Sequence, residues 1–222
     1  MLTGLMMAGG CALFAVFIGM VDGSYGQLID MFTRDHTGHI QIHSKGYLDK
    51  PTIYKIINDP VTIGEKIADL PYVEDWSSRI HTPALSFAGT KTSGVQVIGI
   101  DPVREMNTTR IKYKVSEGRF ITGALRNEII ISERLARVLN VGLGDQIALI
   151  AQGIDGSIAN DLFTIVGKTG SRESTYGGTN CYIHIDSARE FLSMSGGAHE
   201  IVIVLSDHSR ALNTVTLIRQ TV

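Results

Sequence analysis

The first 21 residues constrain the fold most strongly, because they contain no charged side chain. They read MLTGLMMAGGCALFAVFIGMV, and Asp22 is the first charge of the chain. A helix of this length reaches roughly 30 Å, the apolar thickness of a bilayer. Lipid offers backbone amides no partners, and the run lacks the alternation of a membrane-barrel strand. We therefore predict a transmembrane helix over residues 1–21.

Two other interpretations of this run stay open. A secretory signal peptide usually has a basic segment before its apolar region and a small-residue cleavage site after it. This chain has no Lys or Arg before Asp22, and the sequence DGSYG at residues 22–26 is a poor cleavage site. A buried helix of a soluble core usually shows a polar face, which the run lacks.

Small residues recur at a spacing of four along the predicted helix. Small side chains allow membrane helices to approach one another closely, although Gly and Ala are common in such helices in any case. The candidate helix-packing face consists of Ala8, Ala12, Ala15 and Gly19, which Gly4 and Gly23 extend at either end.

The helix is predicted to continue beyond the apolar run as an amphipathic stem over residues 22–35. Tyr25, Leu28, Ile29 and Phe32 are spaced as on one face of a helix. Such an apolar stripe must pack against something, and we expect that to be the domain that follows.

The rest of the chain, roughly 200 residues, is long enough for one large domain or two small ones. The net charge of −2 and the lack of a long basic run give no electrostatic footprint for nucleic-acid binding. Cys11 lies in the apolar run and Cys181 in the distal part, so we do not expect them to form a disulfide.

The pattern of apolar residues predicts an α+β fold. Residues 73–88, interrupted near His81–Pro83, and 95–100 are predicted to form a long hairpin. Helices are expected over 60–70, after a Ser132 cap, from an Asp186 cap to Met194, and after Asp207. Further strands are expected at 38–43, 128–131, 146–151, 162–167, 182–185 and 200–205.

No pattern predicts catalysis, a cofactor or a metal. Gly167-Lys168-Thr169 resembles the end of a phosphate-binding loop, but Leu162 stands where that motif needs glycine. His39 and His43 would lie about 13 Å apart along a strand, too far to share one zinc ion. We interpret these imidazoles as a solvated strand face and the chain as a non-enzyme.

Several short motifs follow one another along the chain: Gly38–Ile42 with Gly46-Tyr47, Glu117–Phe120, Gly144-Asp145 and Phe163–Gly167. Their order resembles the extracytoplasmic domain of MacB-type (FtsX-like) ABC transporter permeases, including the lipoprotein-releasing permeases. The resemblance implies a porter-like α/β subdomain over residues 36–115 and 197–222, with an inserted sabre-like mixed α/β subdomain over 116–196.

The resemblance also implies a function. The chain would be the extracytoplasmic segment of a bacterial inner-membrane permease that couples ATP-driven motion of a cognate ATPase subunit to export or release of a lipoprotein, peptide or lipid. The expected partners are the membrane, a second permease in a dimer, and a periplasmic partner protein or lipoprotein. Compared with that family, the chain is expected to be a fragment without the later membrane helices. A secreted binding module with a signal peptide and an FtsX-like cell-division scaffold remain alternatives.

Overall fold

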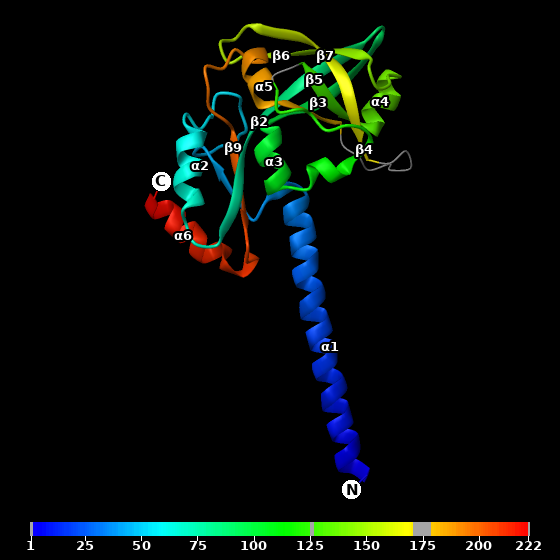
Figure 1. Ribbon diagram of the computed structural model, residues 1–222, viewed down its shortest axis with the longest axis vertical. Helices are drawn as coiled ribbons and strands as arrows, with labels where there is room; N and C mark the ends of the chain where they lie inside the picture. Colours follow the sequence, from blue (N-terminus) through cyan, green and yellow to red (C-terminus); the bar gives the residue numbers. More distant parts are fainter. Residues whose placement is uncertain (1, 125–126, 171–178, 222) are drawn as a thin grey trace.

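The computed structural model shows one long helix that stands away from a mixed α+β domain (Figure 1). The α+β class predicted from the sequence is confirmed. The structure describes residues 2–124, 127–170 and 179–221, apart from the side chains of residues 2, 5, 8, 22, 25–32 and 36.

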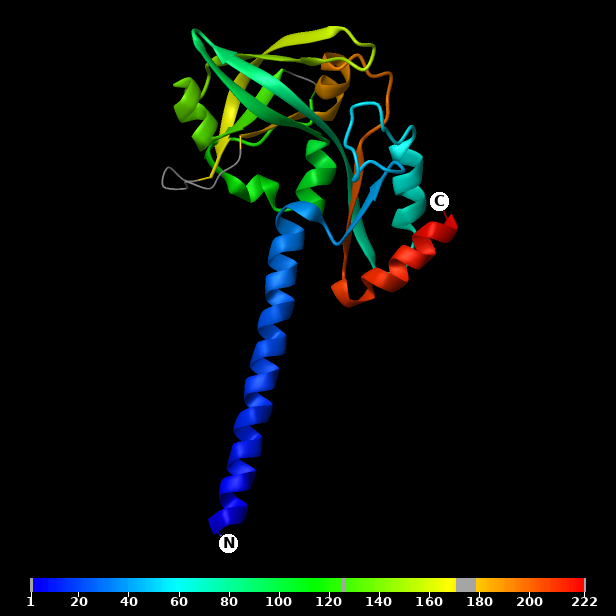
Figure 2. The same cartoon turned by 180° about the vertical axis from the view of Figure 1, so that it is seen from behind.

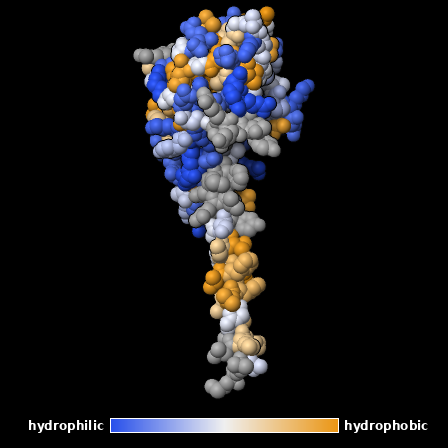
Figure 3. All heavy atoms as spheres, turned by 90° about the vertical axis from the view of Figure 1, so that its right-hand side faces the viewer, coloured by the Kyte–Doolittle hydropathy of each residue, from blue (hydrophilic) through white to orange (hydrophobic). Residues whose placement is uncertain are grey.

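Helix α1 (Leu2–Phe32) includes the apolar run and continues through the predicted stem. Its 31 residues make it about 46 Å long at ~1.5 Å per residue. Large apolar side chains such as Leu13, Phe17 and Met20 are exposed on it. They belong to an apolar band that contrasts with the mostly hydrophilic surface of the domain (Figure 3).

The structure does not show the transmembrane helix that we predicted over residues 1–21. Within the described residues, no helix combines the length and the hydropathy that a membrane crossing requires.

The candidate helix-packing face has no neighbour where it is described. Ala12, Ala15 and Gly19 are exposed, and a Cβ added to Gly19 would have nothing within 4 Å. The side chain of Ala8 lies outside the described residues, as do the side chains of the stem stripe, Tyr25 to Phe32. Both packing faces therefore stay predictions.

Six strands of the domain close into a mixed β-barrel in the order β2-β3-β8-β5-β7-β6. The pairs β3–β8 and β5–β7 are parallel, and the pair β2–β6 closes the barrel with Leu85 opposite Ile150. Ile129, Phe163 and Ile183 are buried in the barrel core, together with residues from α4 (Glu133–Leu139) and α5 (Ile185–Phe191). The barrel strands are β2 (Val73–Ala88), β3 (Lys91–Ile100), β5 (Glu128–Ser132), β6 (Gln146–Gln152), β7 (Ile158–Thr169) and β8 (Asn180–His184).

A second layer adjoins the barrel because β2 extends beyond the part that pairs with β6 in the barrel. The first half of β2 pairs with β9 (Glu200–Leu205), which in turn pairs with β1 (Ile40–His43). Helices α2 (Pro60–Ala68) and α6 (Ala211–Thr221) lie side by side against this layer (Figure 2). They enclose a separate core around Trp76.

Three short elements follow β3 at the base of the barrel. They are α3 (Pro102–Thr108), the 3-10 turn η2 (Ile111–Lys114) and β4 (Val115–Gly118), which pairs with β7. A second 3-10 turn, η3 (His208–Arg210), precedes α6 and is capped by Asp207. Asp207 was expected to cap the final helix itself.

The predicted interruption of β2 and the predicted start and end of α5 were wrong. Strand β2 passes through His81–Pro83 without a break. Pro83 lies after the last residue that pairs with β9, Arg79, and before the first that pairs with β6, Leu85. Its missing N–H therefore costs no ladder hydrogen bond on that side. Helix α5 ends at Phe191 rather than Met194, and its cap is His184 rather than Asp186.

Candidate functional site

The junction between α1 and the domain is the first part of the candidate site. Helix α1 passes into a single π-helical turn, η1 (Thr33–Thr37). The Arg34 guanidinium donates to both carboxylate oxygens of Glu74 on β2, at 2.7 and 3.3 Å, and to the Leu205 carbonyl of β9 at 3.3 Å. One side chain thus ties the end of the helix to two adjacent strands.

Turn η2 holds the same junction from another side. The Arg110 N–H donates to the Arg34 carbonyl at 2.8 Å, and Lys114 pairs with Asp35 at 3.3 Å. Gly38 then turns the chain into β1 with a φ of 66°. A side chain there would collide with Val202, so this close approach of the turn to β9 requires glycine.

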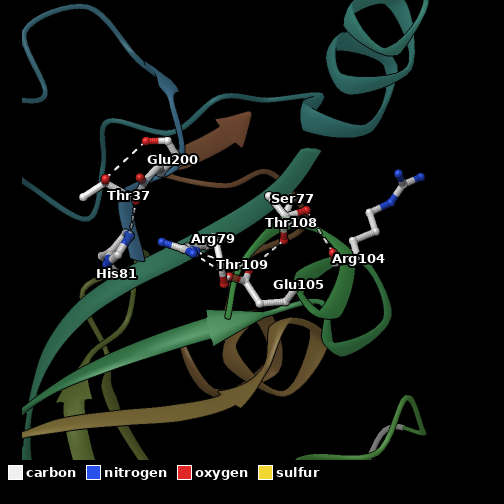
Figure 4. A network of polar contacts seen from close by, with 10 residues as sticks. Thr37, Ser77, Arg79, His81, Arg104, Glu105, Thr108, Thr109 and Glu200 are labelled. Carbon is white, nitrogen blue, oxygen red and sulfur yellow. Dashed lines mark hydrogen bonds and ion pairs between the residues drawn. The ribbon is translucent and has the colours of Figure 1, made fainter. Parts of the chain in front are cut away.

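A buried ion pair joins β2 to α3 (Figure 4). Arg79 on β2 and Glu105 on α3 are 1% and 0% exposed. The guanidinium donates to the two carboxylate oxygens at 2.5 and 3.3 Å. Ser77 and Thr109 donate to the same carboxylate at 2.8 and 2.6 Å, so every oxygen has two donors. Burial opposes ionisation, but the charge of Arg79 and these hydrogen bonds hold the pKa of Glu105 below its ordinary value.

Helix α3 presents Glu105 because Asp101 and Pro102 fix its start. The Asp101 carboxylate accepts from the N–H groups of Val103 and Arg104 at 3.0 and 3.2 Å, and proline suits the first helical turn. The Arg104 guanidinium then lies 3.9 Å from the centre of the Trp76 ring. Sequence reasoning missed this helix, although the Asp-Pro pair was the signal for it.

The histidines of β1 do not form the solvated face that we predicted. His39 Nδ1 accepts from the Leu205 N–H at 2.9 Å, and His43 Nδ1 donates to the His199 carbonyl at 3.1 Å. The ring of His43 also stacks on Tyr47, with 5.1 Å between the centroids. The alternation of β1 was recognised and Gln41 is exposed on its polar face, but His39 and His43 are only partly exposed because other parts of the chain contact them.

A cleft of about 550 Å³ opens beside the ion pair, between β2, α3 and α5. Four of its charged side chains form two pairs, with Arg189 at 2.6 Å from Asp186 and Arg104 at 4.0 Å from Asp101. Within the ranges that the structure describes, no three metal-ligating side chains come together. The described residues show direct contacts between the end of a long helix and the β-domain.

Comparison with known proteins gives the family. The sequence matches the family model of the MacB-like periplasmic core domain over residues 1–221. Among curated proteins, none matches significantly.

Two solved structures share the fold. The extracellular domain of the noncanonic ABC-type transporter YknZ from Gram-positive bacteria is 11% identical with a TM-score of 0.58, and the match covers 81% of this chain and 91% of that one. The periplasmic region of MacB from Actinobacillus actinomycetemcomitans is 12% identical with a TM-score of 0.55, and the match covers 81% of each chain. The chain therefore belongs to the family of MacB-like periplasmic core domains, the part of an ABC-type inner-membrane permease that lies outside the cytoplasm and is not catalytic by itself.

Proposed function

We propose that this domain converts ATP-driven motion of a cognate ATPase subunit into the export or release of a substrate such as a lipoprotein, peptide or lipid. It would work in a permease dimer, with α1 as the lever that carries the motion outward. Residues 36–115 and 197–222 would form the porter-like subdomain and residues 116–196 the sabre-like insert. The observation that carries the proposal is the junction at Arg34, which joins α1 to the domain without a flexible linker.

The physics of a helix supports this role. A hydrogen-bonded helix keeps its axis over its whole length, whereas a Gly/Ser-rich linker behaves as a flexible coil that loses direction. Helix α1 continues without interruption to Phe32, and η1 follows it directly. A rotation or tilt at the far end of α1 would therefore arrive at β2, β9 and η2 together, through the contacts of Arg34, Asp35 and Arg110.

The test is Gly23→Pro in the permease assembled with its ATPase. Proline in a helix interior costs about 3 kcal/mol and kinks or breaks the axis. The matched control is Gly23→Ala, because a Cβ at this exposed position meets nothing within 4 Å. Both variants leave the domain itself untouched, which its melting temperature would verify.

Motion of the domain is read from a spin label at Ile158→Cys, an 81% exposed position at the start of β7, in a Cys11→Ser background. We expect the distance between the labels of two copies to change on ATP addition in the parent protein and in Gly23→Ala, and to stay fixed in Gly23→Pro. An unchanged response in Gly23→Pro would refute the lever, and so would an equal loss in Gly23→Ala.

A further inference from the structure

The loop between β1 and α2, residues 44–59, crosses from one core to the other, and we call it the strap. Ile57 exchanges two backbone hydrogen bonds with Ala198, at 2.7 and 3.0 Å. Tyr54 accepts from Gln152 of the barrel strand β6 at 3.3 Å. The strap therefore touches both the barrel and the β1–β9–β2 layer.

One histidine holds the strap in place through both of its ring nitrogens. The His199 Nε2 lies 3.0 Å from the Ile53 carbonyl of the strap, so this nitrogen must carry the proton that it donates. The backbone N–H of His81 donates to His199 Nδ1 at 3.0 Å, so Nδ1 must be unprotonated. These partners assign the ring to a single neutral tautomer.

Further contacts make a cluster around this ring. Tyr47 of the strap stacks between His43 and His199, with centroid distances of 5.1 and 5.7 Å. His81 Nε2 lies 2.6 Å from the Glu200 carboxylate. In the described part of the chain, His43 Nε2 and Glu200 Oε1 are buried without a hydrogen-bond partner.

The surroundings of His199 disfavour its charged form. Burial lowers the pKa of His199; the hydrogen bond to Ile53 acts in the opposite sense, and the neighbouring His81 and His43 lower it further. The remaining titratable or charged groups are Tyr47 on the strap, Glu200 on β9, and Arg79 on β2 with its partner Glu105 on α3. Burial raises the pKa of Glu200, but the hydrogen bond and charge of His81 and the charge of Arg79 outweigh it and hold this pKa below its ordinary value.

We propose that His199 is a proton-sensitive latch that holds the strap closed when neutral and releases it when protonated. A proton on His199 Nδ1 would point at the backbone N–H of His81, so two hydrogen-bond donors would face each other in a buried site. The ring would leave this position, so the Ile53 carbonyl would lose its donor and Tyr47 would lose one of its two stacking partners. The latch is a property of the domain itself and does not depend on the lever role of α1.

The direction with pH follows from the lowered pKa of His199. A histidine whose pKa is depressed by folding stabilises the closed state above its ordinary value of about 6.5, and this contribution is lost as the pH falls toward the folded-state value. One titrating proton changes the opening equilibrium by up to tenfold per pH unit.

The test is hydrogen exchange on the full chain between about pH 5 and 7.5, with the protection of each amide corrected for intrinsic exchange. The amides of Tyr47 and Ile57, bonded to Ser44 and Ala198, report on the strap. We expect their protection to fall by up to tenfold per pH unit in the parent chain. Their protection should be independent of pH in the His199→Asn variant. The asparagine side-chain oxygen can accept the hydrogen bond from the backbone N–H of His81, but the side chain does not titrate.

The control His208→Asn removes a histidine that stacks on His39 instead, and it should keep the parent slope. A flat parent profile, or an unchanged slope in His199→Asn, would overturn the latch. If the His199→Asn variant does not fold, the titration midpoint of His199 is measured instead in the parent chain, from the NMR signals of its imidazole ring. A His199 midpoint at or above about 6.5 would refute the proposal, and a lower one shared with the strap amides would support it.

Discussion

The substitution Glu105→Gln probes the buried ion pair most directly, because it keeps the shape of the side chain and removes its charge. Both carboxylate oxygens accept two hydrogen bonds, from Arg79 and Thr109 at one and from Arg79 and Ser77 at the other. A glutamine has only one acceptor oxygen, so its NH₂ group would have to face two donors in a site that water does not reach.

The expected loss is about 3–5 kcal/mol, the usual cost of breaking a buried pair from one side. Against a typical total of about 5–15 kcal/mol this is a large share of the free energy of unfolding. Removing both charges in Arg79→Met/Glu105→Leu should recover most of the loss, since apolar replacement of a whole buried pair is often close to neutral. The parent pair also weakens in acid: with a lowered pKa, Glu105 stabilises fully above about pH 4.5 and less as the pH falls through its folded-state value.

Urea unfolding followed by tryptophan fluorescence measures these changes, because Trp76 is the single tryptophan and is 2% exposed. With a slope of about 2 kcal/mol per M, a loss of about 4 kcal/mol lowers the midpoint by about 2 M. A Glu105→Gln midpoint within about 0.5 M of the parent would refute the reasoning. The same holds if the double variant is as unstable as the single one, since the loss would then come from packing rather than from the unbalanced charge.

Two further predictions concern packing and thiol chemistry. Gly64→Ala should destabilise the fold by about 1–3 kcal/mol, because the added Cβ would collide with the Trp76 ring, and it should lower the melting temperature by several degrees; an unchanged melting temperature would show that α2 can shift. Cys11, which is exposed, should react quickly with a maleimide in the native protein. Cys181 should react only after unfolding, because burial raises the pKa of its thiol, and mass spectrometry of the labelled peptides distinguishes the two.

Local signals in the sequence predicted much of the secondary structure. The alternation over residues 73–88 and 95–100 predicted the β2–β3 hairpin, and the apolar run at 200–205 predicted β9. Ser132 caps α4 as expected, with its hydroxyl accepting from the Leu135 N–H at 3.2 Å. The family was also recognised correctly from the order of short motifs. These features are readable because each depends on residues that are near one another in the chain.

The features that were missed depend on contacts between distant residues. Nothing near Leu85 indicates that it will lie opposite Ile150 and close a barrel. The meeting of Arg79 with Glu105 depends on where α3 packs, which the Asp-Pro signal at its start does not specify. His43 was assigned to solvent because alternation identifies a polar face of a strand but not what covers it.

Strand β2 contributes side chains to both cores, and this limits where relatives of this chain can gain or lose residues. Trp76 points into the core under α2 and α6, while Ile80 and Ala84, on the same face of the strand, point into the barrel. Deleting one residue between Trp76 and Ile80 would place the two sets on opposite faces of the strand, so one of them would turn outward. Among relatives, insertions and deletions should therefore occur at the hairpin tip near Gly89, where an added Cβ would meet nothing within 4 Å. They should be rare within the strand itself.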